Sequence, residues 1–521
     1  MSELPSSPPS RLLPIANVLT AQINTAIITL GSFLVTPRIL HALGDSAYGG
    51  WLLVASVMAY IRMLDLGIST GAIKFGAGAE GRGSDQDLAR VFNTASALFI
   101  LVGTAALALT LVMTVVLPRI YPVVLTGHVS TIFLLGAAVS VDLGFRTYGA
   151  ALRARSLFFV PELVEIVSYS VFKLGLVLYF ASTGLSYEIL ASLVLFEAVA
   201  RNFVVIIVAR RASPFTRHMR PLRADLPMLK MMGALSGAVV ILRVAEIVRT
   251  QIDTAVIGFM MPGTPEAMSI FGIGARLPSI AALTIGVIAS TTMPRFSALS
   301  ERLDERGAVA LLGKTSLVTS LATGFLLVNI VVFGPGFLDL WLGRPWVVQS
   351  GLILRMLAAG YVFSLIAGPA ESLLVGRGKL RGLAAFTVIE ALANFALSIA
   401  LIPVLGIYGV ALGTVIPMVI ARAIAFPWFI HQALGIRPMA YLRMNARGLA
   451  VGLAYLALIA GLAWVPLTSY GRFIALGLLS TIVFALLLLV FVAEARVAAR
   501  SIMSRVRSYV QRRLGRGDAS P

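Results

Sequence analysis

The sequence has 521 residues, of which 58% are hydrophobic and only 12% are charged. This composition excludes an ordinary soluble globular protein and predicts an all-α polytopic membrane protein. The chain carries 42 Lys and Arg against 23 Asp and Glu and has no cysteine, which excludes disulfides, thiolate metal sites and cysteine nucleophiles. Its four histidines form no ligand-like cluster, so we expect no metal site and no cofactor.

Apolar runs of about 18 to 30 residues are long enough to cross a bilayer as helices. The sequence contains fourteen such runs, and they predict spans at 12–37, 47–73, 91–117, 128–151, 159–182, 186–209, 229–260, 267–292, 309–334, 347–375, 382–403, 406–430, 447–466 and 473–495. The first run follows a Pro- and Ser-rich N-terminus and is too long for a cleavable signal sequence. It is therefore predicted to remain as a span.

The distribution of basic residues gives a second indication of topology, because Lys and Arg near spans accumulate on the cytoplasmic side. With both termini cytoplasmic, 30 of the 42 Lys and Arg residues fall in cytoplasmic segments and 4 in outer connections. Most of the positive net charge is thus explained by topology and indicates no nucleic-acid partner. The basic tail after 495 is predicted either as an amphipathic helix on anionic inner-leaflet lipids or as a solvated tail that only enforces orientation.

A short internal repeat suggests two similar halves. The segment AQINTAII at 21–28 recurs as TQIDTAVI at 250–257, in the first and seventh predicted spans, so both copies run in the same direction through the membrane. This predicts two six-helix lobes around a central cavity, followed by an extra helix pair. The predicted parts are a disordered N-terminus (1–11), an N-lobe (12–211), a basic linker (212–228), a C-lobe (229–432), the extra pair (433–495) and the basic tail (496–521).

Several charged residues lie inside predicted spans, where a Lys or Arg at mid-helix costs about 2.5 to 3.5 kcal/mol. The seventh span carries Arg243, Glu246, Arg249 and Asp253, whose spacing places them on one helix face. Such a face is predicted to line protein or water rather than lipid. Intramembrane ionisable residues are typical of substrate or ion pathways.

Other spans supply candidates for the same interior. The predicted cavity cations are Arg62, Arg146, Arg243, Arg249, Arg276 and Arg355, and the candidates for counter-ions or for proton or sodium coupling are Asp65, Glu246, Asp253 and Glu390. A structural explanation stays open for pairs such as Arg62 with Asp65 and Asp142 with Arg146. Members of these pairs lie three or four residues apart and can neutralise each other on one helix.

Three segments resemble a known family. The stretch LVTPRILHALGDSAYGGWLLVASVMAYIRMLDLGIS at 34–69 is similar to the opening of bacterial polysaccharide flippases of the Wzx type. FLDLWLG at 337–343 and MPRFSALS at 293–300 resemble further segments of the same family. These flippases belong to the multidrug/oligosaccharidyl-lipid/polysaccharide exporter superfamily, so the resemblance implies a MATE-like fold and a transporter rather than an enzyme.

The resemblance also implies a function and a location. The expected activity is to move an undecaprenyl-pyrophosphate-linked oligosaccharide from the cytoplasmic to the periplasmic leaflet of the bacterial inner membrane, for surface polysaccharide such as O-antigen. We expect a monomer, with glycosyltransferases or a polymerase of the same pathway as candidate partners. Buried arginines fit this cargo, because guanidinium groups bind phosphates by charge-assisted, often bidentate contacts.

The residues fit other classes of membrane protein less well. A cation-coupled multidrug extruder of the same superfamily would favour an interior rich in carboxylates and aromatics, whereas this sequence buries more Arg than such a protein needs. A membrane-embedded polymerase or ligase would need a catalytic platform outside the bilayer, and the predicted outer connections are short. A GxxxxGK loop is missing from the sequence, which disfavours ATP-driven transport. A scaffold role for the cytoplasmic loops stays open as an added function.

Overall fold

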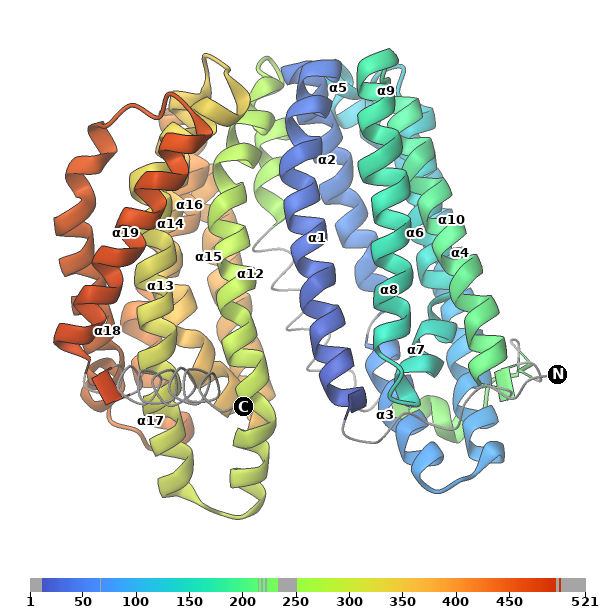
Figure 1. Cartoon of the computed structure of the whole chain (residues 1–521). Coiled ribbons are helices and arrows are strands. Elements are labelled where there is room, and N and C mark those ends of the chain that lie inside the picture. The colour runs from blue at the N-terminus through green and yellow to red at the C-terminus, as the bar shows by residue number, and fades with distance from the viewer. Residues whose placement is uncertain are drawn as a thin grey trace, which may run out of the picture. The chain divides into compact units, whose positions relative to one another are not determined.

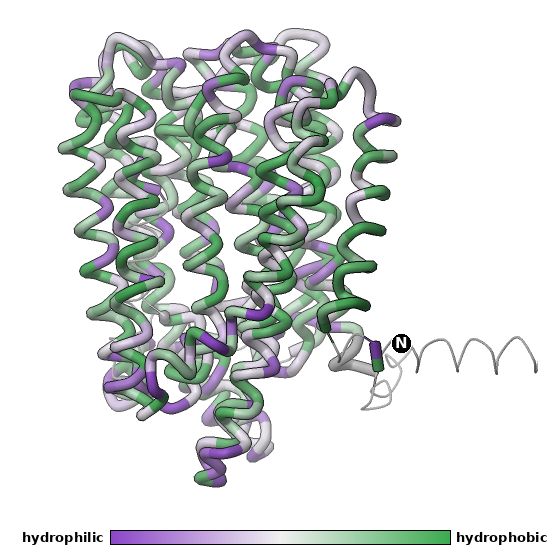
Figure 2. The backbone as a smooth tube through the Cα atoms, turned by 90° about the vertical axis from the view of Figure 1, so that its left-hand side faces the viewer, coloured by the Kyte–Doolittle hydropathy of each residue, from purple (hydrophilic) through white to green (hydrophobic). Residues whose placement is uncertain are grey.

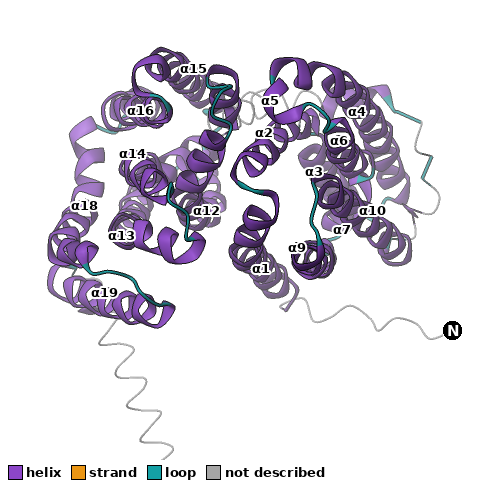
Figure 3. Cartoon of the chain, turned by 90° about the horizontal axis from the view of Figure 1, so that it is seen from above, coloured by secondary structure: helices purple, strands orange, loops and turns teal. Residues whose placement is uncertain are grey.

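The computed structural model describes residues 12–65, 67–213, 215–216, 219–220, 223–232, 251–492 and 496–497. Within these ranges every regular element is a helix (Figures 1 and 3). Thirteen helices of the described part are long and apolar enough to cross a membrane. Figure 2 shows hydrophobic residues along most of the length of these helices and many hydrophilic residues towards their ends. The predicted all-α, multi-pass fold is thereby confirmed, and most of the seventh predicted span, 229–260, lies outside the described residues.

The chain divides into two compact units, here called unit 1 (Met1–Gly272 with Leu380–Thr414) and unit 2 (Ile273–Lys379 with Val415–Pro521). The lobe boundaries expected from the sequence stay a prediction. The described elements of unit 1 are α1 (Leu12–Leu43), α2 (Asp45–Arg62), η1 (Met63–Asp65), α3 (Ile68–Gly81), α4 (Asp85–Ile120), α5 (Pro122–Leu125), α6 (Val129–Gly144), α7 (Arg146–Ala154), α8 (Phe159–Ser168), η2 (Tyr169–Leu176), α9 (Val177–Thr183), α10 (Tyr187–Ala212) and α15 (Leu380–Leu405).

Two helices cross from one unit into the other along the chain, α12 (Glu266–Glu301) and α16 (Ile407–Val419). The remaining described elements belong to unit 2, and they are α13 (Glu305–Leu342), α14 (Val347–Gly376), η4 (Ile420–Ala425), α17 (Phe426–Leu434), α18 (Pro438–Ile459), η5 (Ala460–Trp464) and α19 (Tyr470–Phe491).

The second predicted span, 47–73, is interrupted rather than continuous. After α2 the chain passes through the short turn η1 and reaches Gly67, which has a φ of 77°, a left-handed conformation that glycine adopts without steric cost. Asp65 accepts a hydrogen bond from the backbone N–H of Ser69 at 3.1 Å and thereby caps the first turn of α3. Asp65 and Gly67 thus mark a break between α2 and α3.

The fourth predicted span is interrupted as well. Helix α6 ends at Gly144 and α7 begins at Arg146, with Phe145 between them at φ −102° and ψ 7°. Non-helical backbone is tolerated at membrane depth where it lies within protein or lines a water-filled cavity. Both breaks lie next to charged residues of unit 1, Asp65 at the first and Asp142 and Arg146 at the second.

The described residues of the predicted linker dock against the start of α4. The backbone N–H of Asp225 donates to Thr94 at 2.9 Å, and the guanidinium of Arg90 contacts the Asp225 carboxylate at 2.8 Å. Asp225 also accepts from the backbone N–H of Met228 at 3.1 Å. This backbone hydrogen bond, together with Arg90, holds the pKa of Asp225 below its usual value.

In unit 2 the extra pair α18 and α19 packs on α13. A Cβ atom added to Gly324 would lie 3.0 Å from the Cα of Gly452, so small residues let α13 and α18 approach closely. The side chain of Asn329 on α13 donates to the hydroxyl of Tyr455 on α18 at 2.9 Å and accepts from Ser480 on α19 at 2.8 Å. The pair is therefore an integral part of this unit.

Candidate functional site

Unit 1 contains ion pairs between different helices at the two helix breaks. Arg146 contacts Asp65 with an N–O distance of 3.2 Å, and Arg62 contacts Asp142 at 3.9 Å. The sequence suggested pairs within one helix, Arg62 with Asp65 and Asp142 with Arg146. In the structure each arginine instead pairs with the carboxylate of the other pair. The breaks let the charged side chains reach a neighbouring element, so the pairs join α2 and η1 to α6 and α7.

Arg201 on α10 is the centre of a larger network. Its guanidinium contacts Asp142 at 2.5 Å, Glu197 at 3.4 Å and Glu165 at 3.5 Å. Asp142 also accepts from the side-chain amide of Asn202 at 2.9 Å. Three helices, α6, α8 and α10, thus contribute charged groups to this network of unit 1.

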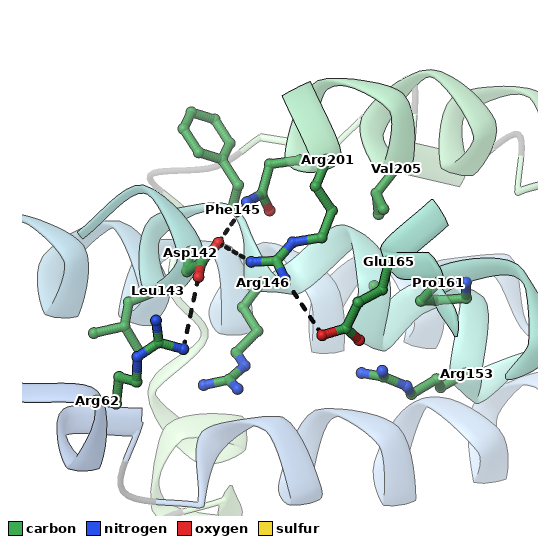
Figure 4. A pocket seen from close by; sticks show the side chains of 12 residues that line it. Arg62, Asp142, Leu143, Phe145, Arg146, Arg153, Pro161, Glu165, Arg201 and Val205 are labelled. Atoms are coloured by element: carbon green, nitrogen blue, oxygen red, sulfur yellow. Dashed lines mark hydrogen bonds and ion pairs between the residues drawn. The ribbon is translucent and has the colours of Figure 1, made fainter. Parts of the chain in front are cut away.

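An open cavity of about 200 Å³ adjoins this network, and Figure 4 shows its lining side chains. It is lined by Arg62, Asp142, Leu143, Phe145, Arg146, Gly149, Arg153, Pro161, Glu165, Arg201, Asn202 and Val205. The Arg62 and Arg146 side chains are 53% and 43% exposed, whereas that of Asp142 is 15% exposed. The two arginine side chains are thus more exposed than this carboxylate, and arginines outnumber carboxylates in the lining, so the cavity can bind an anion.

A further group of polar side chains supports the cavity from behind. Glu162 contacts Arg153 at 3.4 Å and accepts from the buried side chain of Asn24 on α1 at 2.7 Å. Glu197, whose side chain is 4% exposed, also contacts Lys173 at 3.4 Å. Buried carboxylates here have cationic or amide partners, as burial of charge requires.

Sequence reasoning found part of this site. Arg62, Arg146 and Asp65 were predicted and do lie together in unit 1. Arg153 and Arg201 were counted as cytoplasmic topology residues, and the structure instead places both in the cavity lining. The signal that could have identified Arg201 is its position four residues after Glu197, since opposite charges at that spacing share a helix face.

The remaining predicted cations, and Glu246, lie outside the described residues or in unit 2. Arg243, Glu246 and Arg249 lie outside the described residues. Arg276 on α12 and Arg355 on α14 belong to unit 2, where the Arg355 side chain donates to the backbone carbonyl of Val331 at 3.1 Å.

A second set of buried polar side chains in unit 1, named here the α15 cluster, consists of Asp253, Glu390, Asn394, Ser398 and Thr414. Each of these side chains is at least nine-tenths buried, and the Thr414 hydroxyl donates to Asp253 at 3.2 Å. Glu390, Asn394 and Ser398 follow one face of α15 at four-residue spacing. Both amide atoms of Asn394 lack a hydrogen-bond partner within the described structure, so this cluster has unused polar atoms that can take a cation or water.

No family model and no curated protein matches the sequence. A multidrug resistance MATE family transporter of the MOP superfamily in an inward-facing conformation has a TM-score of 0.69 at 14% identity, over 78% of this chain and 95% of its own. The lipid II flippase MurJ, in an inward closed conformation, has a TM-score of 0.67 at 14% identity, over 95% of this chain and 100% of its own.

A third solved structure is a MOP superfamily transporter from Pyrococcus furiosus Vc1 (DSM3638), for which reverse polarity of the binding pocket suggests a different function. It has a TM-score of 0.56 at 15% identity, over 81% of this chain and 96% of its own. At these identities the likeness shows the fold. The chain therefore has the membrane transporter fold shared by MATE proteins and the MurJ flippase.

Proposed function

We propose that the protein is a flippase that moves an undecaprenyl-pyrophosphate-linked oligosaccharide from the cytoplasmic to the periplasmic leaflet of the bacterial inner membrane. The observation that carries this proposal is the cavity of unit 1, where the side chains of Arg62 and Arg146 are more exposed than the carboxylate of Asp142 beside them. A pyrophosphate is a compact anion, and arginine is the side chain best suited to bind it by paired N–H donors. Transport would proceed by alternating access of two lobes.

The comparison with MurJ supports a lipid-linked cargo over a drug. Its match covers 95% of this chain, whereas the match with the MATE transporter covers 78%. A multidrug extruder that carries cations would need carboxylates at the surface of its cavity. The cavity of unit 1 is instead lined by four arginines, Arg62, Arg146, Arg153 and Arg201, against two carboxylates, Asp142 and Glu165. The multidrug extruder remains the second candidate, since the MATE fold accommodates it.

The α15 cluster is the proposed site of cation coupling. Its carboxylates, Asp253 and Glu390, were candidates from the sequence, and both are buried. Buried carboxylates inside a membrane protein are typical of proton and ion pathways. We further propose a monomer that contacts anionic inner-leaflet lipids and works beside the glycosyltransferases or polymerase of its pathway.

Reconstitution in liposomes tests the function. The substrate is a fluorescently labelled undecaprenyl-pyrophosphate-linked oligosaccharide, and the rate at which the label changes leaflet is measured for wild type, Arg62→Gln and Arg146→Gln. We expect each substitution to slow translocation about tenfold or more, because each removes a charge-assisted contact. Arg82→Gln is the matched control, since Arg82 is 63% exposed and pairs with Asp87 outside the cavity.

A second arm separates the two candidates. Efflux of a cationic dye from the same liposomes is measured with the same variants. A flippase leaves the dye in place and moves the glycolipid. Dye efflux by wild type without glycolipid translocation would reject the flippase and favour the extruder.

A further inference from the structure

Arg153 occupies a position like that of Arg62 and Arg146, although sequence reasoning assigned it to topology. It lines the same cavity, its side chain is 30% exposed, and it contacts Glu162 at 3.4 Å. Glu162 in turn accepts from Asn24 at 2.7 Å. Asn24 is 5% exposed and lies outside the cavity lining. The chain of contacts thus runs from a buried neutral amide through a carboxylate to a guanidinium that faces the cavity.

The carboxylate partner of Arg146 is held in the same way. Arg146 contacts Asp65, and Asp65 accepts from both the backbone N–H and the hydroxyl of Ser69, at 3.1 Å and 2.9 Å. Ser69 belongs to the first turn of α3, directly after the helix break. The carboxylate of Asp65 is therefore held by Ser69 independently of its contact with Arg146.

The carboxylate partner of Arg62 completes the pattern. Asp142 contacts Arg62 at 3.9 Å and is held from behind by Arg201 at 2.5 Å and Asn202 at 2.9 Å. In each case the carboxylate has a shorter contact to its supporting donor than to the cavity-facing arginine. An arginine has five N–H donors, so one carboxylate contact leaves donors available for a ligand.

We propose that Arg153 is a third diphosphate-binding residue of this cavity, beside Arg62 and Arg146. Asp65, Asp142 and Glu162 are positioning residues that fix the direction of these three guanidinium groups. This role differs from that of a counter-ion that merely competes with the ligand, because a held guanidinium loses less side-chain entropy when it binds. The inference rests on the proposed function, since it names the part of the lipid-linked cargo that the cavity of unit 1 receives.

The ligand class follows from the number of cations. A monophosphate presents one tetrahedral group, whereas a diphosphate presents two linked groups and more oxygens to a set of guanidinium donors. A cavity of about 200 Å³ suits such a head group and leaves the glycan outside it. The site is therefore expected to prefer a diphosphate over a monophosphate that carries the same lipid tail.

Neutral substitutions behind the carboxylates test the positioning role, because they leave the charge of the cavity unchanged. The protein is purified in nanodiscs, and binding of geranyl pyrophosphate and geranyl monophosphate is measured for wild type, Asn24→Ala and Ser69→Ala. We expect each variant to bind geranyl pyrophosphate about fivefold more weakly, with a smaller loss for the monophosphate. Thr25→Ala is the control for Asn24→Ala, since Thr25 is exposed on α1 and bonds to the carbonyl of Ala21 in its own helix.

A second pair of variants separates position from charge. Glu162→Gln keeps an oxygen that can accept from Asn24 and Arg153, and it is expected to bind geranyl pyrophosphate at least as tightly as wild type. Glu162→Ala loses the contact, and binding is expected to weaken about tenfold, as it does in Arg153→Gln. Equal tightening in both Glu162 variants would mean that the carboxylate is only a competing counter-ion, and the proposal would be overturned.

Further outcomes also decide the question. Wild-type affinity in Asn24→Ala and Ser69→Ala overturns the positioning role. An equal loss for both ligands together with a lower melting temperature overturns it too, because that is the signature of a general packing defect. If the variants behave as expected but wild type does not translocate the glycolipid, the proposed function fails and the inference stands. If wild type translocates and the variants bind normally, only the inference fails.

Discussion

Replacement of Arg201 by methionine is expected to destabilise unit 1 strongly. The Arg201 guanidinium contacts Asp142, Glu165 and Glu197, and the Glu197 side chain is only 4% exposed. Removal of one member of a buried ion pair costs about 3 to 5 kcal/mol. Arg201 itself is 21% exposed, and Lys173 remains as a partner of Glu197, so we expect a loss of about 3 kcal/mol in the free energy of unfolding, near the lower limit of that range.

The physical reason can be tested by a double-mutant cycle. Glu197→Gln removes a buried charge that Arg201→Met leaves with Lys173 as its cationic partner, so the double variant is expected to recover about 1 to 2 kcal/mol. The assay is equilibrium unfolding of the purified protein by SDS in mixed micelles, followed by tryptophan fluorescence. Arg82→Met is the control, and the exposed pair of Arg82 with Asp87 should contribute less than about 1 kcal/mol. If the energies of the two single variants simply add in the double variant, the reasoning is refuted.

Three other predictions concern separate parts of the chain. Gly448→Val should separate α18 from α13 and lower the melting temperature by several degrees, because a Cβ at Gly448 would meet the Ser320 side chain. Gly477→Ala is the control and should have little effect, since nothing lies within 4 Å of a Cβ at that position. The pKa of Asp225 is lowered in the folded protein. The ionised carboxylate therefore stabilises the docked linker fully at a pH above the pKa that Asp225 has in the unfolded chain, and this stabilisation is lost as the pH falls through the lower folded pKa. Proteolysis of the linker, measured across an acid titration, tests this prediction, and a rate of cleavage that does not change with pH contradicts it. Asp253→Asn should abolish the dependence of transport on a sodium or proton gradient while binding of the lipid head is kept, and unchanged ion dependence would exclude the α15 cluster as the coupling site.

The membrane spans were predictable from the sequence because apolar length is a one-dimensional property. Thirteen candidate spans occur in the described part of the chain, in agreement with the positions read from hydrophobic runs. The interruptions at Gly67 and Phe145 were not predicted. Window-averaged hydropathy smooths over a break of a few residues, and the left-handed φ of Gly67 depends on which conformation the surrounding helices select.

The partners of the charged residues were predictable only in part. Helical periodicity identifies neighbours on the same helix, so it suggested pairing of Arg62 with Asp65, while the structure pairs Arg62 with Asp142 on α6. Such pairing between helices depends on packing, which a single sequence does not encode as a local pattern. Arg201 was missed for a different reason: counts of basic residues near span ends treat every arginine there as a topology signal.

The most direct test of the central claim is a cryo-electron microscopy structure of the protein in nanodiscs with the undecaprenyl-pyrophosphate-linked oligosaccharide bound. The account predicts that density for the two phosphates lies in the cavity of unit 1, within hydrogen-bond distance of Arg62, Arg146 and Arg153. Phosphate density at any other place, with these three guanidinium groups still bound only to their carboxylates, would contradict it.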